Sequence, residues 1–265
     1  MNQQELTLQM KTACFHNAYG GDAVRAFCGG GNLVAEKGST AALCDEGGFI
    51  RVYWTVQQEE DFTPLYEKAA QKANGKPFIS EIVYRMDQPS AAQRLIRAGM
   101  EEYSRLVYMT RTPDRVSNTG GGGYCSHAID SPCNEKAVIE DIDTIYQHLW
   151  DMFDPLVSHL PSRTQLKRYI QNGEAAVVRV GQKIGAFALF QELGAQATYI
   201  YQLATVPDER GKGLAGTLLH NELRQFGRQR AFSLWVEERN RAAAALYTKY
   251  GFAPAGRRLT ILKGA

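Results

Sequence analysis

Residues 210–216, R-G-K-G-L-A-G, form a glycine-rich stretch between two regular patterns. A run of β-forming residues, 198–206, precedes the stretch, and a helical pattern that extends toward Arg228 follows it. Glycines let the backbone come close to an anion, and the first N–H groups of a helix have no partner inside that helix. The positive end of the helix dipole adds to their attraction for a phosphate. The stretch therefore predicts a phosphate-binding loop.

Two familiar phosphate-binding patterns match this loop in part. A P-loop needs G-x-x-x-x-G-K-[ST], and Thr217 stands where the lysine of that pattern belongs, which excludes it. The dinucleotide fingerprint G-x-G-x-x-G is matched by Gly211, Gly213 and Gly216, and Glu237 follows about 20 residues later. However, four residues separate the strand from Gly211, and the end of the chain at residue 265 would cut a Rossmann half short. A dinucleotide binder is thus an alternative that the loop alone leaves open.

A longer match extends beyond the loop. Residues 210–215 fit R/Q-x-x-G-x-G/A, and residues 240–252, N-R-A-A-A-A-L-Y-T-K-Y-G-F, fit N-x-x-A-x-x-L-Y-x-x-x-G-F at every fixed position. A strand pattern at 232–236 lies between the two blocks. In these motifs, their order and their spacing, the chain resembles the GNAT superfamily of acyl-CoA N-acyltransferases. The resemblance is dense from about residue 140 to residue 262, roughly half of the chain.

The resemblance implies that acetyl-CoA binds as cosubstrate between two splayed parallel strands, 198–206 and 232–236, and that its acetyl group passes directly to an amine. It implies a pantetheine ladder and oxyanion donors on the first strand, pyrophosphate contacts in the loop, and a helix-capping asparagine that reaches the pantetheine arm. The cofactor-binding residues expected on this basis are Leu203, Ala204, Thr205, Val206, Arg210, Gly211, Lys212, Gly213, Leu214, Ala215, Gly216 and Asn240.

Tyr247 is the catalytic residue that we expect from the second block. A CoA thiolate must leave a partly desolvated site, and a phenol with a reference pKa of about 10 can protonate it or donate a hydrogen bond to it. The general base does not emerge, because the strand T-Y-I-Y-Q-L-A-T-V carries no carboxylate. Tyr199, Tyr201, Glu192, Glu237 or a chain of water molecules could assist, or the amine could arrive neutral.

Composition excludes several classes of protein. The formal net charge of +2 gives no general footprint for nucleic acid, and no apolar run approaches the length of a membrane span. The first 20 residues lack the apolar segment of a signal peptide, so we expect a cytoplasmic protein. The expected partner is a small-molecule or peptide amine, with no nucleic acid and no membrane. Cys125, His127 and Cys133 lack a fourth ligand at usual spacing, so we expect no metal.

The predicted fold class is α/β with two GNAT-like domains, each a central mixed β-sheet flanked by helices, and a splayed parallel strand pair in the C-terminal domain. Residues 113–134 are rich in glycine, serine and proline and predict a linker. We therefore expect a degenerate domain at 1–112, without the CoA pyrophosphate loop, and a catalytic acetyltransferase domain at 135–265.

An internal echo supports two copies. A shift of 152 positions places residues 79–109 on residues 231–261, so that Gln88 meets Asn240, Ala91 meets Ala243, Gly99 meets Gly251 and Met100 meets Phe252. Both glycines suit the left-handed position that ends a helix. Leu95 stands in place of Tyr247, and no R/Q-x-x-G-x-G/A lies between residues 56 and 77. The first copy should therefore support the second one without binding CoA in the same manner. Besides an N-acetyltransferase, a catalytically silent CoA-binding module remains possible, because the carboxylate is missing.

Overall fold

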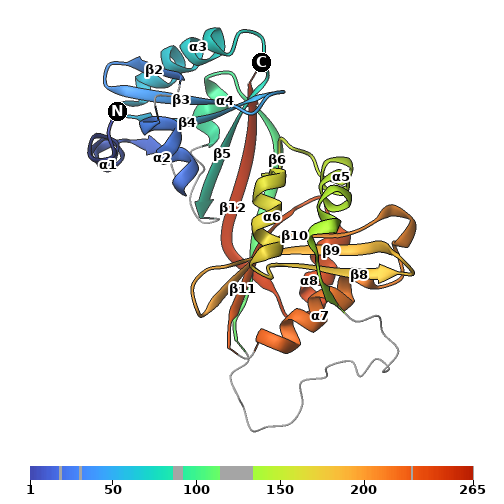
Figure 1. Cartoon of the computed structure of the whole chain (residues 1–265). Coiled ribbons are helices and arrows are strands. Elements are labelled where there is room, and N and C mark those ends of the chain that lie inside the picture. Colours follow the sequence, from blue (N-terminus) through green and yellow to red (C-terminus); the bar gives the residue numbers. More distant parts are fainter. Residues whose placement is uncertain (18–19, 30–31, 86–91, 114–133, 228, 265) are drawn as a thin grey trace. The chain divides into compact units, whose positions relative to one another are not determined.

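The computed structural model describes residues 1–17, 20–29, 32–85, 92–113, 134–227 and 229–264 (Figure 1). Most of the predicted linker lies outside these residues. So do the metal-ligand candidates Cys125, His127 and Cys133 and the positions Gln88 and Ala91 of the internal echo. The chain forms two compact units. Unit 1 comprises 1–107, 237–239 and 256–265, and unit 2 comprises 108–236 and 240–255.

Unit 2 alternates helices and strands in the order that the sequence predicts. Its elements are β7 (Glu135–Lys136), α5 (Ile142–Met152), α6 (Arg163–Gln171), β8 (Ala175–Val180), β9 (Lys183–Glu192), β10 (Ala197–Thr205), α7 (Leu214–Phe226), β11 (Ala231–Glu237) and α8 (Arg241–Lys249), with 3₁₀ turns at Ile139–Asp141 and Pro207–Glu209. The strands follow the order β11-β10-β9-β8-β7. Strands β10 and β11, which α7 joins, pair in parallel, and the neighbours β8–β9 and β9–β10, which short turns join, pair antiparallel. Strand β7 also pairs antiparallel with β8, although α5 and α6 lie between them in the chain.

Helices cover both faces of the unit 2 sheet. On one face, Leu149 of α5 and Leu166 of α6 belong to a core with Phe187 and Leu189 of β9. On the other face, Leu218 and Leu219 of α7 are fully buried, as their helical spacing predicts, and α7 packs against β8, β9 and β10. This part of the chain is therefore an α/β unit with a mixed sheet flanked by helices.

Unit 1 repeats this order of elements. They are α1 (Gln3–Thr12), β1 (Phe15–His16), α2 (Gly20–Cys28), β2 (Asn32–Glu36), β3 (Ser39–Asp45), β4 (Ile50–Val56), α3 (Phe62–Ala73), β5 (Phe78–Arg85), α4 (Ala92–Arg97) and β6 (Glu101–Arg111), with a 3₁₀ turn at Glu59–Asp61. Apart from the short strand β1, unit 1 has two helices, three antiparallel strands, a 3₁₀ turn, a helix, a strand, a helix and a strand. The same succession runs from α5 to strand β12 (Ala253–Gly264). Buried side chains of α3 pack on one face of the sheet, and those of α1 and α2 pack on the other.

The two units differ from the predicted domains at the end of the chain. Residues 257–264 of β12 pair with residues 78–85 of β5 and so belong to unit 1, whereas the prediction assigned them to the domain 135–265. The last residues of β6, 108–111, belong to unit 2 instead. Sequence spacing assigns a strand to its neighbours in the chain, but the ladder that it joins is decided by long-range pairing.

The two glycines of the echo end their helices in the same way. Gly99 and Gly251 have φ angles of +118° and +83°. The N–H of Met100 donates to the Leu95 carbonyl at 3.0 Å, and that of Phe252 donates to the Tyr247 carbonyl at 3.1 Å. These bonds satisfy helix-end carbonyls that would otherwise lack a partner, which is why a left-handed glycine is favoured there.

Candidate functional site

Strands β10 and β11 diverge soon after they begin. Their parallel ladder pairs Ala197 with Ala231, Thr198 with Phe232 and Tyr199 with Ser233. Strand β9 occupies the opposite edge of β10 as far as Thr205. Among the residues that the structure describes, no ladder pair is recorded on the β11 side of β10 beyond Tyr199. The two strands therefore part after Tyr199 and Ser233, and beyond this point the side of β10 that faces away from β9 has no recorded ladder partner; we call this parting of the strands the opening.

The directions of the N–H groups show which of the residues predicted to bind the pantetheine arm face the opening. The N–H of Val206 donates to the Gly185 carbonyl, on the β9 side, at 2.9 Å. Because successive residues of a strand direct their N–H groups to opposite edges, those of Leu203 and Thr205 point to the opening, and that of Ala204 points to β9. A bulge between Ile200 and Gln202 resets this alternation. Two of the four predicted residues thus present an amide to the opening, and Ala204 and Val206 do not.

The phosphate-binding loop ends in an uncapped helix N-terminus. Gly213 is the N-cap of α7, with φ of +79°, and no side chain caps the helix there. The first helical bond runs from the N–H of Thr217 to the Gly213 carbonyl at 3.0 Å. The N–H groups of Gly213, Leu214, Ala215 and Gly216 are therefore the four that a helix cannot satisfy by itself. Such a terminus fits an anion such as pyrophosphate.

Gly211 and Gly216 play different structural parts in this loop. Gly211 has φ of +80°, and a Cβ there would meet nothing within 4 Å, so its conformation is what requires glycine. A Cβ on Gly216 would lie 3.1 Å from the Tyr250 hydroxyl of α8. Gly216 therefore permits close packing of α7 on α8. The sequence motif predicted only a role in anion binding for this glycine.

The two predicted loop cations are not equivalent. The ammonium of Lys212 forms an ion pair with Glu209 at 2.8 Å. Arg210 is exposed beside the loop, and its own N–H donates to the Pro207 carbonyl at 3.2 Å. The Glu209 carboxylate offsets part of the positive charge of Lys212, so Arg210 should contribute more to the attraction of a phosphate.

The second motif block positions Asn240 and Tyr247. The Asn240 side chain accepts a hydrogen bond from the N–H of Ala243 at 3.1 Å and so caps α8. Tyr247 lies two turns later, is 7% exposed, and packs on Phe252 with ring centroids 5.6 Å apart. Burial raises the pKa of the Tyr247 phenol, so the hydroxyl is protonated at neutral pH.

Tyr199 lies where β10 and β11 part, at the closed end of the opening. Tyr199 belongs to the last β10–β11 pair, and burial raises the pKa of its phenol. The nearby Tyr108, Tyr247 and Tyr169 raise that pKa further. Both phenols are therefore protonated at neutral pH. Neither phenol is suited to the role of general base, which Tyr199 was one candidate to fill.

Aromatic side chains gather on the α6 face around this closed end. Tyr201 stacks on Tyr169 of α6 at 5.8 Å and donates from its hydroxyl to the His159 carbonyl. On the other strand, the ring of Trp235 lies 4.9 Å from that of Tyr108. The sequence prediction included Tyr199 and Tyr201 but missed Tyr108, Tyr169 and Trp235. The alternation of tyrosines along 198–206 was the signal that could have suggested an aromatic face.

The remaining predicted helpers lie in ion pairs. Glu192 pairs with Arg230 at 2.5 Å, and Glu237 pairs with Arg239. In the described part of the chain, no group of three histidine, cysteine, aspartate or glutamate residues could hold a metal ion. None of the described helices is both long enough and apolar enough to cross a membrane.

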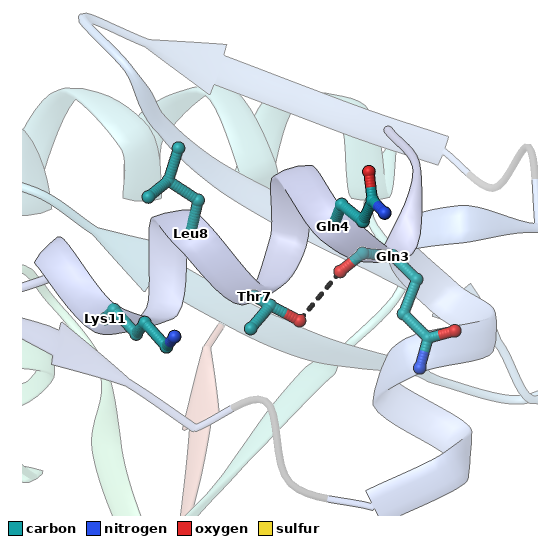
Figure 2. A pocket seen from close by; sticks show the side chains of 5 residues that line it. All are labelled: Gln3, Gln4, Thr7, Leu8 and Lys11. Carbon is teal, nitrogen blue, oxygen red and sulfur yellow. Dashed lines mark hydrogen bonds between the residues drawn. The ribbon is translucent and has the colours of Figure 1, made fainter.

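Hollows elsewhere do not coincide with these residues. One of about 470 Å³ lies along the outer side of α1 and is lined by Gln3, Gln4, Thr7, Leu8 and Lys11 (Figure 2). All five come from a single helix, and the hydrogen bond between Thr7 and the Gln3 carbonyl, 2.8 Å long, is internal to it. This hollow is open helix surface without the convergent groups of a binding site.

The residues that build this arrangement lie within a stretch of the chain that is similar to a known family. Residues 142–252 match the acetyltransferase (GNAT) family. The GNAT match extends from α5 to Phe252 and supports an acyltransferase. No curated protein matches the chain.

Solved structures share the fold over most of the chain. A GCN5-related N-acetyltransferase from Kribbella flavida is 14% identical, with a TM-score of 0.61, over 100% of this chain and 96% of that one. Another from Sphaerobacter thermophilus is 16% identical, with a TM-score of 0.59, over 85% and 76%. A tandem GNAT protein from the clavulanic acid biosynthesis pathway is 15% identical, with a TM-score of 0.54, over 88% and 81%. At these identities the likeness is one of fold.

Proposed function

We propose that unit 2 is an acetyl-CoA-dependent N-acetyltransferase that moves an acetyl group directly to a primary amine of a small molecule or peptide. The observation that carries the proposal is the unpaired edge of β10. It lies between strands that part after Tyr199 and Ser233, next to an uncapped helix N-terminus. An extended ligand with amide groups fits the edge, and its phosphates fit the helix.

Each residue then has a part in transfer. N–H groups of Gly213 to Gly216 bind the pyrophosphate. The N–H of Leu203 or Thr205 donates a hydrogen bond to the thioester oxygen, which gains negative charge as the amine nitrogen attacks its carbon. When the C–S bond breaks, the Tyr247 hydroxyl donates to the departing thiolate. One such backbone donor contributes about 10²- to 10³-fold in rate. The amine enters neutral or first loses a proton to water, and after the attack its nitrogen loses one further proton to water, which leaves the amide. Water takes these protons in the proposal because the described residues of β10 carry no carboxylate.

The acceptor would approach from the α6 face, opposite α7. The aromatic side chains around the opening, among them Tyr201 and Trp235, suit an amine that is attached to an apolar or planar body. Transfer across the opening needs no covalent enzyme intermediate, so amine and thioester must be bound at the same time.

We further propose that unit 1 is a degenerate second copy of unit 2. Three helix-end hydrogen bonds support it, since each joins residues 152 positions before those of its counterpart. They are Ala98 to Arg94, Gly99 to Ile96 and Met100 to Leu95, which correspond to Tyr250 to Leu246, Gly251 to Thr248 and Phe252 to Tyr247. A chance similarity in fold between the two units would not require these helix-end bonds to fall at the same spacing of 152 residues.

A silent CoA-binding module is the second candidate, and the missing carboxylate on β10 favours it. The two are separated by following release of the CoA thiol over a panel of amines, after binding of acetyl-CoA has been established by thermal shift. A ligand at 100 times its Kd stabilises by roughly 2.7 kcal/mol. Binding without thiol release from any amine would favour the silent module, and stabilisation by NAD in place of acetyl-CoA would favour a dinucleotide binder.

A further inference from the structure

Unit 1 contains an opening like that of unit 2. Strand β4 pairs in parallel with β5 at two positions, Ile50 with Phe78 and Arg51 with Ile79. Strand β3 occupies the other edge of β4 from Ile50 to Thr55. Any further partner of β4 must therefore use the edge from which β5 has departed.

The chain itself occupies that edge. In β1, Phe15 pairs with Val56 and His16 with Thr55, in antiparallel orientation. The next residue, Asn17, is 4% exposed, and its own N–H donates to the Trp54 carbonyl at 3.2 Å. The N-terminal segment thus continues into the opening, where unit 2 has no corresponding strand among its described residues.

The side chain of Asn17 joins the two diverging strands. Its Oδ1 accepts from the N–H of Trp54 at 2.6 Å. Its Nδ2 donates to the carbonyls of Val52, at 3.3 Å, and Glu81, at 3.1 Å. A primary amide therefore satisfies an edge N–H of β4 and carbonyls on both strands.

The pantetheine arm of CoA is itself a chain of amides, so it offers a strand edge the same donors and acceptors as Asn17. We propose that the opening between β4 and β5 is a second amide-binding slot, and that the chain's own Asn17 fills it in place of a pantetheine amide. This rests on the proposed function, since it takes unit 1 as a copy of an acyl-CoA-binding unit. It explains how backbone groups along the parted strands of unit 1 are satisfied by the chain itself.

Neighbouring contacts close the slot. The ring of Phe15 packs on that of Phe62 with centroids 5.3 Å apart, at the first residue of α3. The indole N–H of Trp54 donates to the Ser80 hydroxyl of β5 at 2.6 Å. Helix α3 begins without a glycine turn, and its third residue is Pro64, which lacks an N–H. The slot should thus hold an amide, and the start of α3 should not bind a pyrophosphate as the start of α7 does, so the chain should bind one acyl-CoA.

The first test is chemical rescue of the variant Asn17→Ala, followed by thermal unfolding. Loss of three hydrogen bonds to buried backbone groups should lower the melting temperature by roughly 4 to 10 °C. Acetamide at increasing concentration should restore part of this loss. Acetone, which is of similar size but has no N–H, should restore less. Wild-type protein and Asn172→Ala, which removes an exposed asparagine amide, should show no selective gain from acetamide.

A melting temperature unchanged by Asn17→Ala, or a loss that acetamide and acetone restore equally, would overturn the proposal. Should the alanine variant not fold, Asn17→Ser provides the same comparison, because it also removes the amide that contacts Trp54, Val52 and Glu81 and leaves space for acetamide. Calorimetric titration of the wild type with CoA should give one site per chain, and two sites would also contradict a filled slot. Rescue is read from unfolding and needs no catalysis, so a failure of the proposed acetyltransferase activity would be seen separately.

Discussion

Removal of the Tyr247 hydroxyl is the most direct test of the proposed mechanism. Tyr247→Phe keeps the ring that packs on Phe252 and deletes one buried hydrogen-bond donor. Burial raises the pKa of this phenol, which makes it a weaker acid than tyrosine in water. We therefore expect it to act by hydrogen bonding to the thiolate more than by complete proton transfer, since a thiol has a reference pKa of about 8.5.

The expected magnitude follows from that role. A hydrogen bond to a charged group contributes about 1.5–3 kcal/mol, and the buried setting of Tyr247 favours the upper value. At about 1.4 kcal/mol per factor of ten, the turnover number should fall roughly 10²-fold in Tyr247→Phe. The affinity for CoA should change little, because the hydroxyl serves the departing sulfur and not the ground state.

The assay is the release of CoA thiol with the best amine of the panel, with CoA binding measured in parallel. Tyr66→Phe is the matched control, since it deletes a phenol hydroxyl that donates to the Gly99 carbonyl in unit 1. Tyr247→Leu reproduces the residue at the corresponding position of unit 1, Leu95, and should be at least as slow as Tyr247→Phe. Unchanged turnover in Tyr247→Phe would remove this residue from the mechanism, and an equal loss in Tyr66→Phe would show a general effect of destabilisation.

Four further predictions concern binding, acceptor choice and stability. Gly213→Val should cost about 1–2 kcal/mol of folding free energy, because of its positive φ, and should also weaken CoA binding in titration calorimetry. Arg210→Ala should weaken CoA roughly threefold to tenfold, and Lys212→Ala less, because Glu209 already pairs with Lys212; the reverse order would contradict our assignment. Trp235→Ala should raise KM for arylalkyl amines more than for polyamines. Burial raises the pKa of Tyr247 in the folded chain, so above pH 10 the unfolded chain loses this proton first. The free energy of unfolding should therefore fall as the pH rises above 10, and it should fall less steeply in Tyr247→Phe.

Local features of the site were predictable because they depend on residues close in sequence. The glycine turn and the start of α7 follow from residues 210–216, and Asn240 caps α8 through a bond that spans three residues. The left-handed glycines Gly99 and Gly251 likewise close helices within one turn. These steric and hydrogen-bonding requirements act over a few residues, and so the sequence carries them directly.

Tertiary structure alone decided which groups meet. The pairing of β10 with β9 decides that the N–H groups of Leu203 and Thr205 face the opening and that those of Ala204 and Val206 face β9. No sequence motif contains this pairing. Gly216 proved to be a packing position because Tyr250 of another helix lies against it. Likewise β12 joins β5, and Asn17 bridges β4 and β5, although these partners are far apart in the chain. Distant segments compete for the same backbone groups, and this competition sets both the register of a strand and the segment that pairs with its edge. A local sequence pattern carries no information about that competition.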